Sequence, residues 1–471
     1  MGTQYNKSYV AAITVIATLG GLLFGYDTAV ISGAEKSVEA YLIRPLGLSA
    51  FIHGATVSSA LIGCIIGGVI SGFLTNRVGR KKSLLTAAVI FFISALGSGY
   101  PETFFFTRGE PNTGLLLMFN FYRIFGGIGV GLASAVCPMY ISEIAPANIR
   151  GRLVSWNQFS IIFGMLTVYF VNWGIANGQA IAWINDVGWR YMFVSEAIPA
   201  ALFGLLALCL PETPRYLAMT GQDKKAINVL TKIMDSRDKA VTILKEIKET
   251  IAEKAQAHVF SYGGTVIIIG ILLSVFQQFV GINVALYYAP RIFESMGAAK
   301  DASMLQTAVM GLVNVIFTVV AIMTVDKWGR KPLLITGSIG MAVGMFALSV
   351  LSFTNTIGIS TLVFIIIYTA SFMMSWGPIC WVLISEIFPN KIRGQAVAIA
   401  VASQWIANYL ISSTYPPMME FSGGITYGFY AVMGVLSAIF VWKMVPETKG
   451  KSLEDMDRLW KKKSIKSNKS I

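Results

Sequence analysis

Charged side chains are scarce in this sequence of 471 residues. They make up 13% of the chain, against 55% for hydrophobic residues, whereas soluble domains carry roughly 25% charged residues. Long uncharged runs recur between Tyr9 and Val445, and only one sizeable polar stretch separates them. The composition excludes a soluble multidomain enzyme and predicts a membrane protein.

Cysteine and histidine are also few. Four cysteines each lie in an apolar run without a CxxC pair, and the two histidines are far apart, at positions 53 and 258. This pattern excludes a disulfide framework and predicts no metal site. The glycine-rich segment 126–131 (GGIGVG) follows no strand, so it predicts close helix packing rather than a nucleotide loop. No ATP site, other cofactor or enzymatic activity is predicted.

The basic residues give a formal charge of +13. They gather in alternate connections between apolar runs, around positions 77–82, 150–152, 327–331, 391–393 and 449–469. That alternation is the positive-inside pattern of a multi-pass membrane protein, and it argues against a nucleic-acid partner. The first apolar run is too long for a signal-peptide core and is expected to stay as the first span.

Apolar runs of about 20 residues predict about twelve transmembrane helices, and so an all-α membrane protein. The first six are expected at 9–33, 52–75, 83–100, 115–138, 153–177 and 190–210, and the second six at 263–293, 303–325, 332–353, 358–384, 395–416 and 424–445. The amphipathic stretch 211–262 predicts a cytoplasmic linker of short helices, and 446–471 a cytoplasmic tail. An even number of spans puts both termini on one side of the membrane, and the basic ends place that side in the cytoplasm.

An internal repeat divides these spans into two halves. The segment 142–151 (SEIAPANIRG) returns at 385–394 (SEIFPNKIRG), and NRVGRK at 76–81 and PET at 211–213 return as DKWGRK at 326–331 and PET at 446–448. The predicted fold is therefore two pseudo-symmetric six-helix bundles, at 1–210 and 263–445. This organisation is typical of an alternating-access transporter.

These motifs resemble those of the sugar porters of the major facilitator superfamily over nearly the whole chain. The segments GGLLFGYDTAVISG at 20–33 and QQFVGIN at 277–283 are more closely similar to bacterial D-xylose:proton symporters. The resemblance implies a monomeric carrier in the bacterial inner membrane that binds D-xylose or a related sugar and a proton.

A sugar needs neutral side chains that both donate and accept hydrogen bonds, and an aromatic wall for its ring. Amides within apolar spans either bond across helices or face a cavity, and for a single amide the two alternatives are about even. The resemblance favours sugar contacts for the amides Gln158, Gln277, Gln278, Asn283, Asn314 and Gln404, the aromatics Phe24, Tyr287, Trp381 and Trp405, and Gly377.

Two features qualify this site. Gly281, Pro290, Gly377 and Pro378 are expected to break helices seven and ten, and broken helices in transporters line substrate cavities. Met165 lies two turns after Gln158, where the xylose-symporter pattern has a second glutamine. An apolar thioether there would relax discrimination between pentose and hexose.

Three ionisable residues lie well within apolar spans of the first half: Asp27, Arg123 and Glu196. Such residues are costly in a membrane and usually functional. An aspartate that faces Arg123 can couple proton binding to motion if the pair forms and breaks during the cycle, with Glu196 holding Arg123 from the other side. A static ion pair that fixes helix packing is the alternative.

Charged residues on the cytoplasmic side are expected to form ion pairs between the halves that act as a gate. They are Arg80, Glu143, Arg150, Asp326, Arg330, Glu386 and Arg393, and the alternative is that they only orient the helices. The function predicted is proton-coupled sugar import; a facilitative uniporter, or a sugar sensor that does not transport, are the alternatives.

Overall fold

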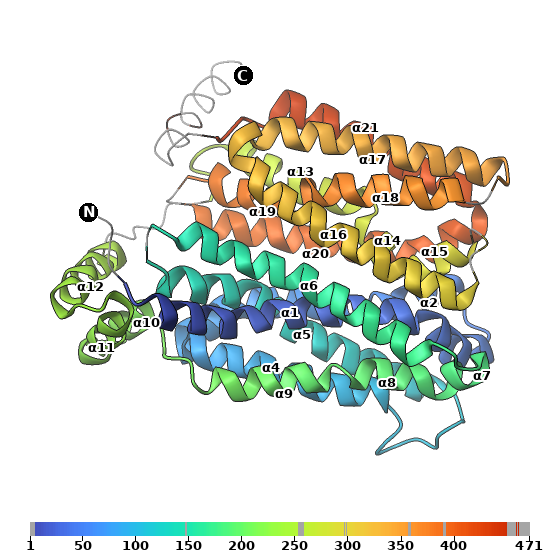
Figure 1. Cartoon of the computed structure of the whole chain (residues 1–471), viewed down its shortest axis with the longest axis horizontal. Coiled ribbons are helices and arrows are strands. Elements are labelled where there is room, and N and C mark those ends of the chain that lie inside the picture. The colour runs from blue at the N-terminus through green and yellow to red at the C-terminus, as the bar shows by residue number, and fades with distance from the viewer. Residues whose placement is uncertain are drawn as a thin grey trace. The chain divides into compact units, whose positions relative to one another are not determined.

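The computed structural model describes residues 5–146, 148–252, 259–295, 297, 299–356, 359–389, 392–449, 458 and 460 (Figure 1). These residues form helices and contain no strand. Twelve helical segments among them are long and apolar enough to cross a membrane. The predicted class and the predicted number of spans are confirmed.

The first six spans are built from nine helices: α1 (Lys7–Val38), α2 (Ala50–Val57), α3 (Ser59–Val78), α4 (Arg80–Gly99), α5 (Thr113–Ile144), α6 (Arg150–Ala176), α7 (Ile181–Trp183), α8 (Trp189–Val194) and α9 (Ala197–Ala207). The predicted end of the first span at 33 was wrong. Helix α1 continues through a π-helix (Glu39–Ile43) and a 3₁₀ turn (Arg44–Leu46), because the charges near its end are neutralised by partners.

Glycines set the closest helix crossing in the first half. A Cβ on Gly25 of α1 would meet the carbonyl of Ile161 on α6, and one on Gly164 of α6 would meet the carbonyl of Leu22. The two backbones therefore approach more closely than any side chain would permit. This crossing positions the face of α1 that carries Asp27.

The predicted linker contains three short helices, α10 (Pro214–Met219), α11 (Asp223–Met234) and α12 (Arg237–Ala252). Thr213 caps α10, since its hydroxyl accepts a hydrogen bond from the Tyr216 N–H, and a proline begins the helix. The apolar faces meet in a small core of Leu217, Ala226, Leu230, Ala240 and Leu244. His258 lies outside the described residues.

The second six spans also comprise nine helices: α13 (Gly264–Phe279), α14 (Ile282–Tyr287), α15 (Ala289–Ser295), α16 (Lys300–Trp328), α17 (Arg330–Phe353), α18 (Ile359–Met373), α19 (Trp376–Ile387), α20 (Arg393–Phe421) and α21 (Gly423–Met444). Of the predicted tail, only 446–449, 458 and 460 are described; the rest of the basic cluster at 449–469, and Lys391, lie outside the described residues.

Helices seven and ten are interrupted where the sequence predicts. Gly281 separates α13 from α14 with φ of +89°, in the left-handed region that favours glycine. The second break, at Met374 and Ser375, comes just before Gly377 and Pro378 in the first turn of α19. Pro290 is the second residue of α15, where the missing N–H costs no hydrogen bond.

Contacts divide the chain into two compact units. Unit 1 holds Met1–Val30, Ile62–Val168 and Val187–Ala255, and unit 2 holds Ile31–Leu61, Tyr169–Asp186 and Gln256–Ile471. Unit 2 thus contains the end of α1, all of α2 and the end of α6 together with the second-half helices. The predicted division at 210 and 263 follows the repeat in the sequence and stays a prediction.

Candidate functional site

The intramembrane charges of unit 1 include a buried ion pair. Arg123 Nη1 on α5 lies 2.8 Å from Asp27 Oδ1 on α1, and Arg123 Nη2 donates to the Asp27 carbonyl at 3.3 Å. Their side chains are 2% and 0% exposed. The guanidinium also lies 5.2 Å from the centre of the Phe193 ring. A Cβ on Gly126 would lie 2.2 Å from Ser94 Oγ, so glycine there lets α5 pack closely against α4 beside Asp27.

Glu196, between α8 and α9, does not hold Arg123 as predicted. Within the described part of the chain both its carboxylate oxygens are buried without a hydrogen-bond partner, and so is Asp27 Oδ2. Glu196 is nevertheless close enough to Asp27 and Arg123 for their charges to act on it. The expected clamp on Arg123 from both sides is replaced by one ion pair with a second buried carboxylate nearby, because Arg123 directs both amino groups at Asp27.

In unit 2 the predicted amides form a continuous chain. Asn283 Nδ2 on α14 donates to Gln278 Oε1 at 2.5 Å, and Gln278 Nε2 donates to Gln277 Oε1 at 3.4 Å. Gln277 Nε2 in turn donates to the carbonyls of Trp376, at 2.9 Å, and Gly377, at 3.4 Å. The chain therefore links the break in helix seven to the break in helix ten.

Two more predicted amides of unit 2, Asn314 and Gln404, lie outside this chain of hydrogen bonds. Asn314 on α16 and Gln404 on α20 are 2% and 5% exposed, and their side-chain oxygens have no hydrogen-bond partner among the described residues. A buried acceptor without a donor is costly, and a ligand hydroxyl would supply that donor. Trp405 on α20 is buried, whereas Trp381 on α19 is half-buried.

The aromatic Tyr287 has a partner that the sequence analysis missed. Asn408 Nδ2 on α20 donates to the Tyr287 hydroxyl at 3.4 Å, and Asn408 Oδ1 accepts from the Ser412 hydroxyl at 3.0 Å. Asn408 lies one helical turn after Gln404 and so on the same face. The spacing from Gln404 could therefore have identified Asn408 as a residue of the site.

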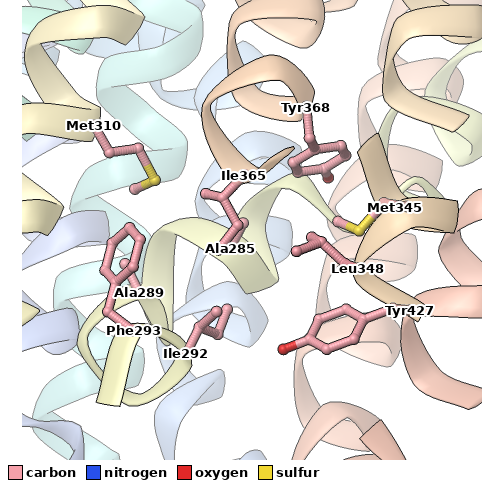
Figure 2. A pocket seen from close by; sticks show the side chains of 10 residues that line it. All are labelled: Ala285, Ala289, Ile292, Phe293, Met310, Met345, Leu348, Ile365, Tyr368 and Tyr427. Carbon is pink, nitrogen blue, oxygen red and sulfur yellow. The ribbon is translucent and has the colours of Figure 1, made fainter. Parts of the chain in front are cut away.

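The remaining predicted sugar contacts belong to unit 1. Phe24 on α1 and Gln158 on α6 are half-buried, whereas Met165 is buried where α6 crosses α1. A separate pocket in unit 2 is lined by apolar parts of Ala285 on α14, three residues of α15 and side chains of α16, α17, α18 and α21 (Figure 2). Its lack of amides makes it unsuited to a sugar.

The repeated charged motifs make the same contacts in both halves. In unit 1, Arg80 Nη2 lies 2.9 Å from Glu143 Oε1, and the Thr213 hydroxyl donates to Glu143 Oε2 at 2.6 Å. In unit 2 the matching distances are 2.9 Å from Arg330 to Glu386 and 2.6 Å from Thr448 to Glu386. The duplication seen in the sequence is therefore also a duplication of side-chain contacts.

The glutamates of the two PET motifs accept hydrogen bonds from the first residues of α4 and α17, the helices that begin at the repeated Gly-Arg-Lys segments. The backbone N–H of Arg80 donates to Glu212 at 3.0 Å, and that of Arg330 to Glu447 at 3.1 Å. Burial raises the pKa of Glu212 above its ordinary value, against the hydrogen bonds it accepts. Burial acts in the same direction on Glu447, but four backbone N–H groups outweigh it and lower the pKa.

The expected gate pairs differ from those found. The ion pairs of Arg80 and Arg330 each join residues of one half, where pairs between the halves were expected. Arg150 is exposed, and Arg393 donates to the Phe388 carbonyl at 3.4 Å. The Asp326 side chain lies outside the described residues. Thr213, Glu212 and their counterparts in the second half were recognised as a repeat but not as partners of these arginines.

Comparison with known proteins extends over the whole chain. A family profile described as "Sugar (and other) transporter" matches residues 13–460. The D-xylose-proton symporter of Escherichia coli strain K12 is 52% identical over 489 residues, covering 100% of this chain and 99% of that protein. The glucose facilitated diffusion protein of Zymomonas mobilis is 38% identical, covering 98% and 99%. The partially occluded inward-open structure of the E. coli xylose transporter has a TM-score of 0.87 at 52% identity, covering 95% and 100%.

Proposed function

The chain belongs to the sugar transporter family, as its motifs predicted, and we propose that it imports D-xylose together with protons by alternating access. The observation that carries the proposal is the buried Asp27–Arg123 pair with Glu196 beside it. A carrier without proton coupling has no need of an excess buried carboxylate. The 38% identity to a facilitated-diffusion protein keeps a uniporter as the second candidate.

Coupling follows from the charge of this cluster. Two ionised carboxylates and one guanidinium leave one excess negative charge in a buried place, and one added proton makes the cluster neutral. Protonation of Asp27 from the outside would release Arg123 and permit closure over the sugar. The proton would leave when the inward-facing state restores the pair.

Sugar recognition is assigned to unit 2. Its amide chain supplies donors and acceptors at two helix breaks, Asn314 and Gln404 supply acceptors, and Tyr287, Trp381 and Trp405 supply the apolar wall. The sugar contacts expected of Phe24, Gln158 and Met165, which lie in unit 1, stay predictions from the sequence. The cytoplasmic ion pairs Arg80–Glu143 and Arg330–Glu386 are proposed to stabilise the gate from within each half.

The setting is that of a multi-pass membrane protein. We infer a bacterial inner membrane, both termini in the cytoplasm and a monomer as the working unit. The basic connections at 77–82 and 327–331 support that orientation.

The experiment that tests this function uses purified protein in liposomes with a trapped pH-sensitive dye. Addition of D-xylose outside is expected to acidify the lumen, because protons enter with the sugar. Exchange of labelled xylose without any pH change would favour the uniporter and make the Asp27–Arg123 pair structural.

Glutamine at position 165 is expected to sharpen the preference for xylose over glucose by about tenfold, because one amide would add a hydroxyl contact worth 1–3 kcal/mol in discrimination. The measurement is competition of each sugar with labelled xylose. Met165→Leu is the matched control, since it keeps an apolar side chain of similar size. An unchanged ratio in Met165→Gln means that position 165 does not touch the sugar.

A further inference from the structure

A second buried ion-pair network lies in unit 2, at the end of α1 remote from the N-terminus. Arg291 on α15 binds Glu35 on α1 through two bonds, Nε to Oε1 at 2.6 Å and Nη2 to Oε2 at 2.8 Å. Arg291 Nη2 also binds Glu39. The Glu35 side chain is 1% exposed, whereas that of Arg291 is 30% exposed. A bidentate pair is a strong and directional contact.

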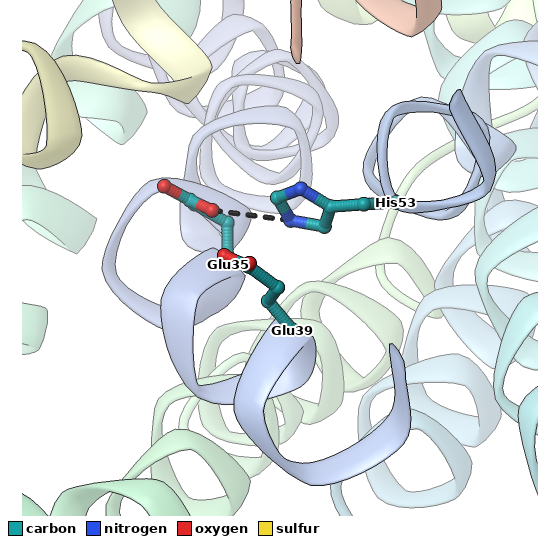
Figure 3. Close-up of side chains that lie close together, drawn as sticks. All are labelled: Glu35, Glu39 and His53. Atoms are coloured by element: carbon teal, nitrogen blue, oxygen red, sulfur yellow. Dashed lines mark ion pairs between the residues drawn. The ribbon is translucent and has the colours of Figure 1, made fainter. Parts of the chain in front are cut away.

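Histidine completes the network from α2. His53 Nε2 lies 3.2 Å from Glu35 Oε2, and its side chain is 3% exposed (Figure 3). Its ring meets Tyr288 edge to face, 6.3 Å between centres, and Tyr288 packs on Tyr415 of α20 at 4.8 Å. Near this network on the same helices, Lys36 pairs with Glu294.

Two carboxylates and an imidazole whose ligand atoms lie within 4.8 Å of one another resemble a divalent-cation site. Here the guanidinium of Arg291 already binds oxygens of both Glu35 and Glu39. A metal ion would have to displace a bidentate cation, and its charge would add to that of Arg291. The cluster is therefore an internal ion pair and not a metal site.

The network joins the two halves of the repeat. Glu35, Glu39 and His53 belong to spans one and two, whereas Arg291 follows span seven. Glu35 comes 28 residues after Lys7 in the same helix, about 40 Å along its axis at 1.5 Å per residue. With the N-terminus in the cytoplasm, these contacts lie at the outer end of the protein.

We propose that Glu35, Glu39 and Arg291 are further residues of the transport cycle, forming an outer latch that must open before sugar binds from outside. The inference rests on the proposed alternating access, in which the two halves separate at the outer end. Glu35 and Glu39 belong to the first half and Arg291 to the second, so opening breaks both contacts of the guanidinium. His53 stays beside Glu35, because both residues belong to the first two spans.

The test measures the opening of the outer end directly. Spin labels at Thr107→Cys and Thr354→Cys, two exposed connections on that end, would be placed in a Cys209→Ser background, since Cys209 is an exposed cysteine. Distances between the labels would be recorded by pulsed electron paramagnetic resonance, in the parent and in each variant at the same pH.

Glu35→Gln is expected to raise the open population at least about tenfold, because it leaves Arg291 without its bidentate partner. Arg44→Gln is the matched control. Arg44 pairs with Glu39 at 3.1 Å, but its side chain is 70% exposed, so its removal should leave the open population unchanged.

Two results would overturn the latch. An open population in Glu35→Gln equal to that of the parent removes the ion pair from gating, and an equal rise in Arg44→Gln assigns the effect to lost surface charge. If a single variant does not fold, Glu35→Gln with Arg291→Gln removes both charges and preserves the comparison. A parent that carries xylose without acidifying liposomes contradicts the proposed coupling and leaves the latch measurement intact.

Discussion

Asparagine at position 27 is expected to abolish uphill accumulation of xylose while sparing exchange down its gradient. The amide cannot ionise, so Arg123 loses the partner whose charge changes during the cycle, and the Glu196 carboxylate is left to balance it. With no proton-dependent step, the ratio of inside to outside sugar falls to one. The measurement is uptake of labelled xylose into vesicles under an imposed pH gradient, beside exchange in the same vesicles.

A second buried pair in unit 1 provides the control for that experiment. Glu102 and Arg190 lie 2.8 Å apart and are 7% and 0% exposed, so they match the Asp27 pair in burial and distance. Glu102→Gln breaks a structural pair and should cost about 3–5 kcal/mol of stability, so accumulation and exchange fall together. If Asp27→Asn behaves like Glu102→Gln, or keeps accumulation, the coupling role of Asp27 is wrong.

The spans, the helix breaks and the Asp27–Arg123 pair could be predicted, because the pattern that indicates each one lies within one short segment of the sequence. An uncharged run has the length of a membrane crossing, a glycine with proline marks a break, and a lone charge in such a run needs a partner. Few partners exist among the spans of the first half, so Arg123 was within reach of sequence reasoning. The proximity of the amides Gln277, Gln278 and Asn283 could also be predicted, because they lie within one short segment.

Contacts between distant segments explain the failures. The Glu and Arg that recur seven residues apart in each half were expected to form ion pairs between the halves. Helix α5 ends at Ile144, however, Arg150 begins α6, and Glu143 pairs with Arg80 of its own half. Glu35 and Arg291 are 256 positions apart. No periodicity in the sequence relates positions so far apart. The charged residues after position 33 instead suggested that the first span ends there.

Alanine at position 278 or 283 is expected to weaken xylose binding about 10- to 100-fold, since each variant removes one or two hydrogen bonds worth 1–1.5 kcal/mol or more. Gln278 and Asn283 bond to each other beside Gly281, so losing either also disorders the other's amide. Their stability should change little: Asn283 is only half-buried, and although Gln278 is 3% exposed, a water molecule can take the place of its amide between Gln277 and Asn283. Titration calorimetry with xylose and thermal unfolding together measure the two effects.

Gln277 supplies the contrast that separates sugar binding from packing. Its amide donates to the Trp376 and Gly377 carbonyls at the break in helix ten, so Gln277→Ala leaves buried backbone acceptors unpaired and should lower the unfolding temperature as well as the affinity. If all three alanine variants lose stability and none loses affinity for xylose, the whole amide chain serves helix packing. If Gln278→Ala and Asn283→Ala lose affinity for xylose but keep their stability, the sugar binds at the break in helix seven, because these two amides lie on either side of that break.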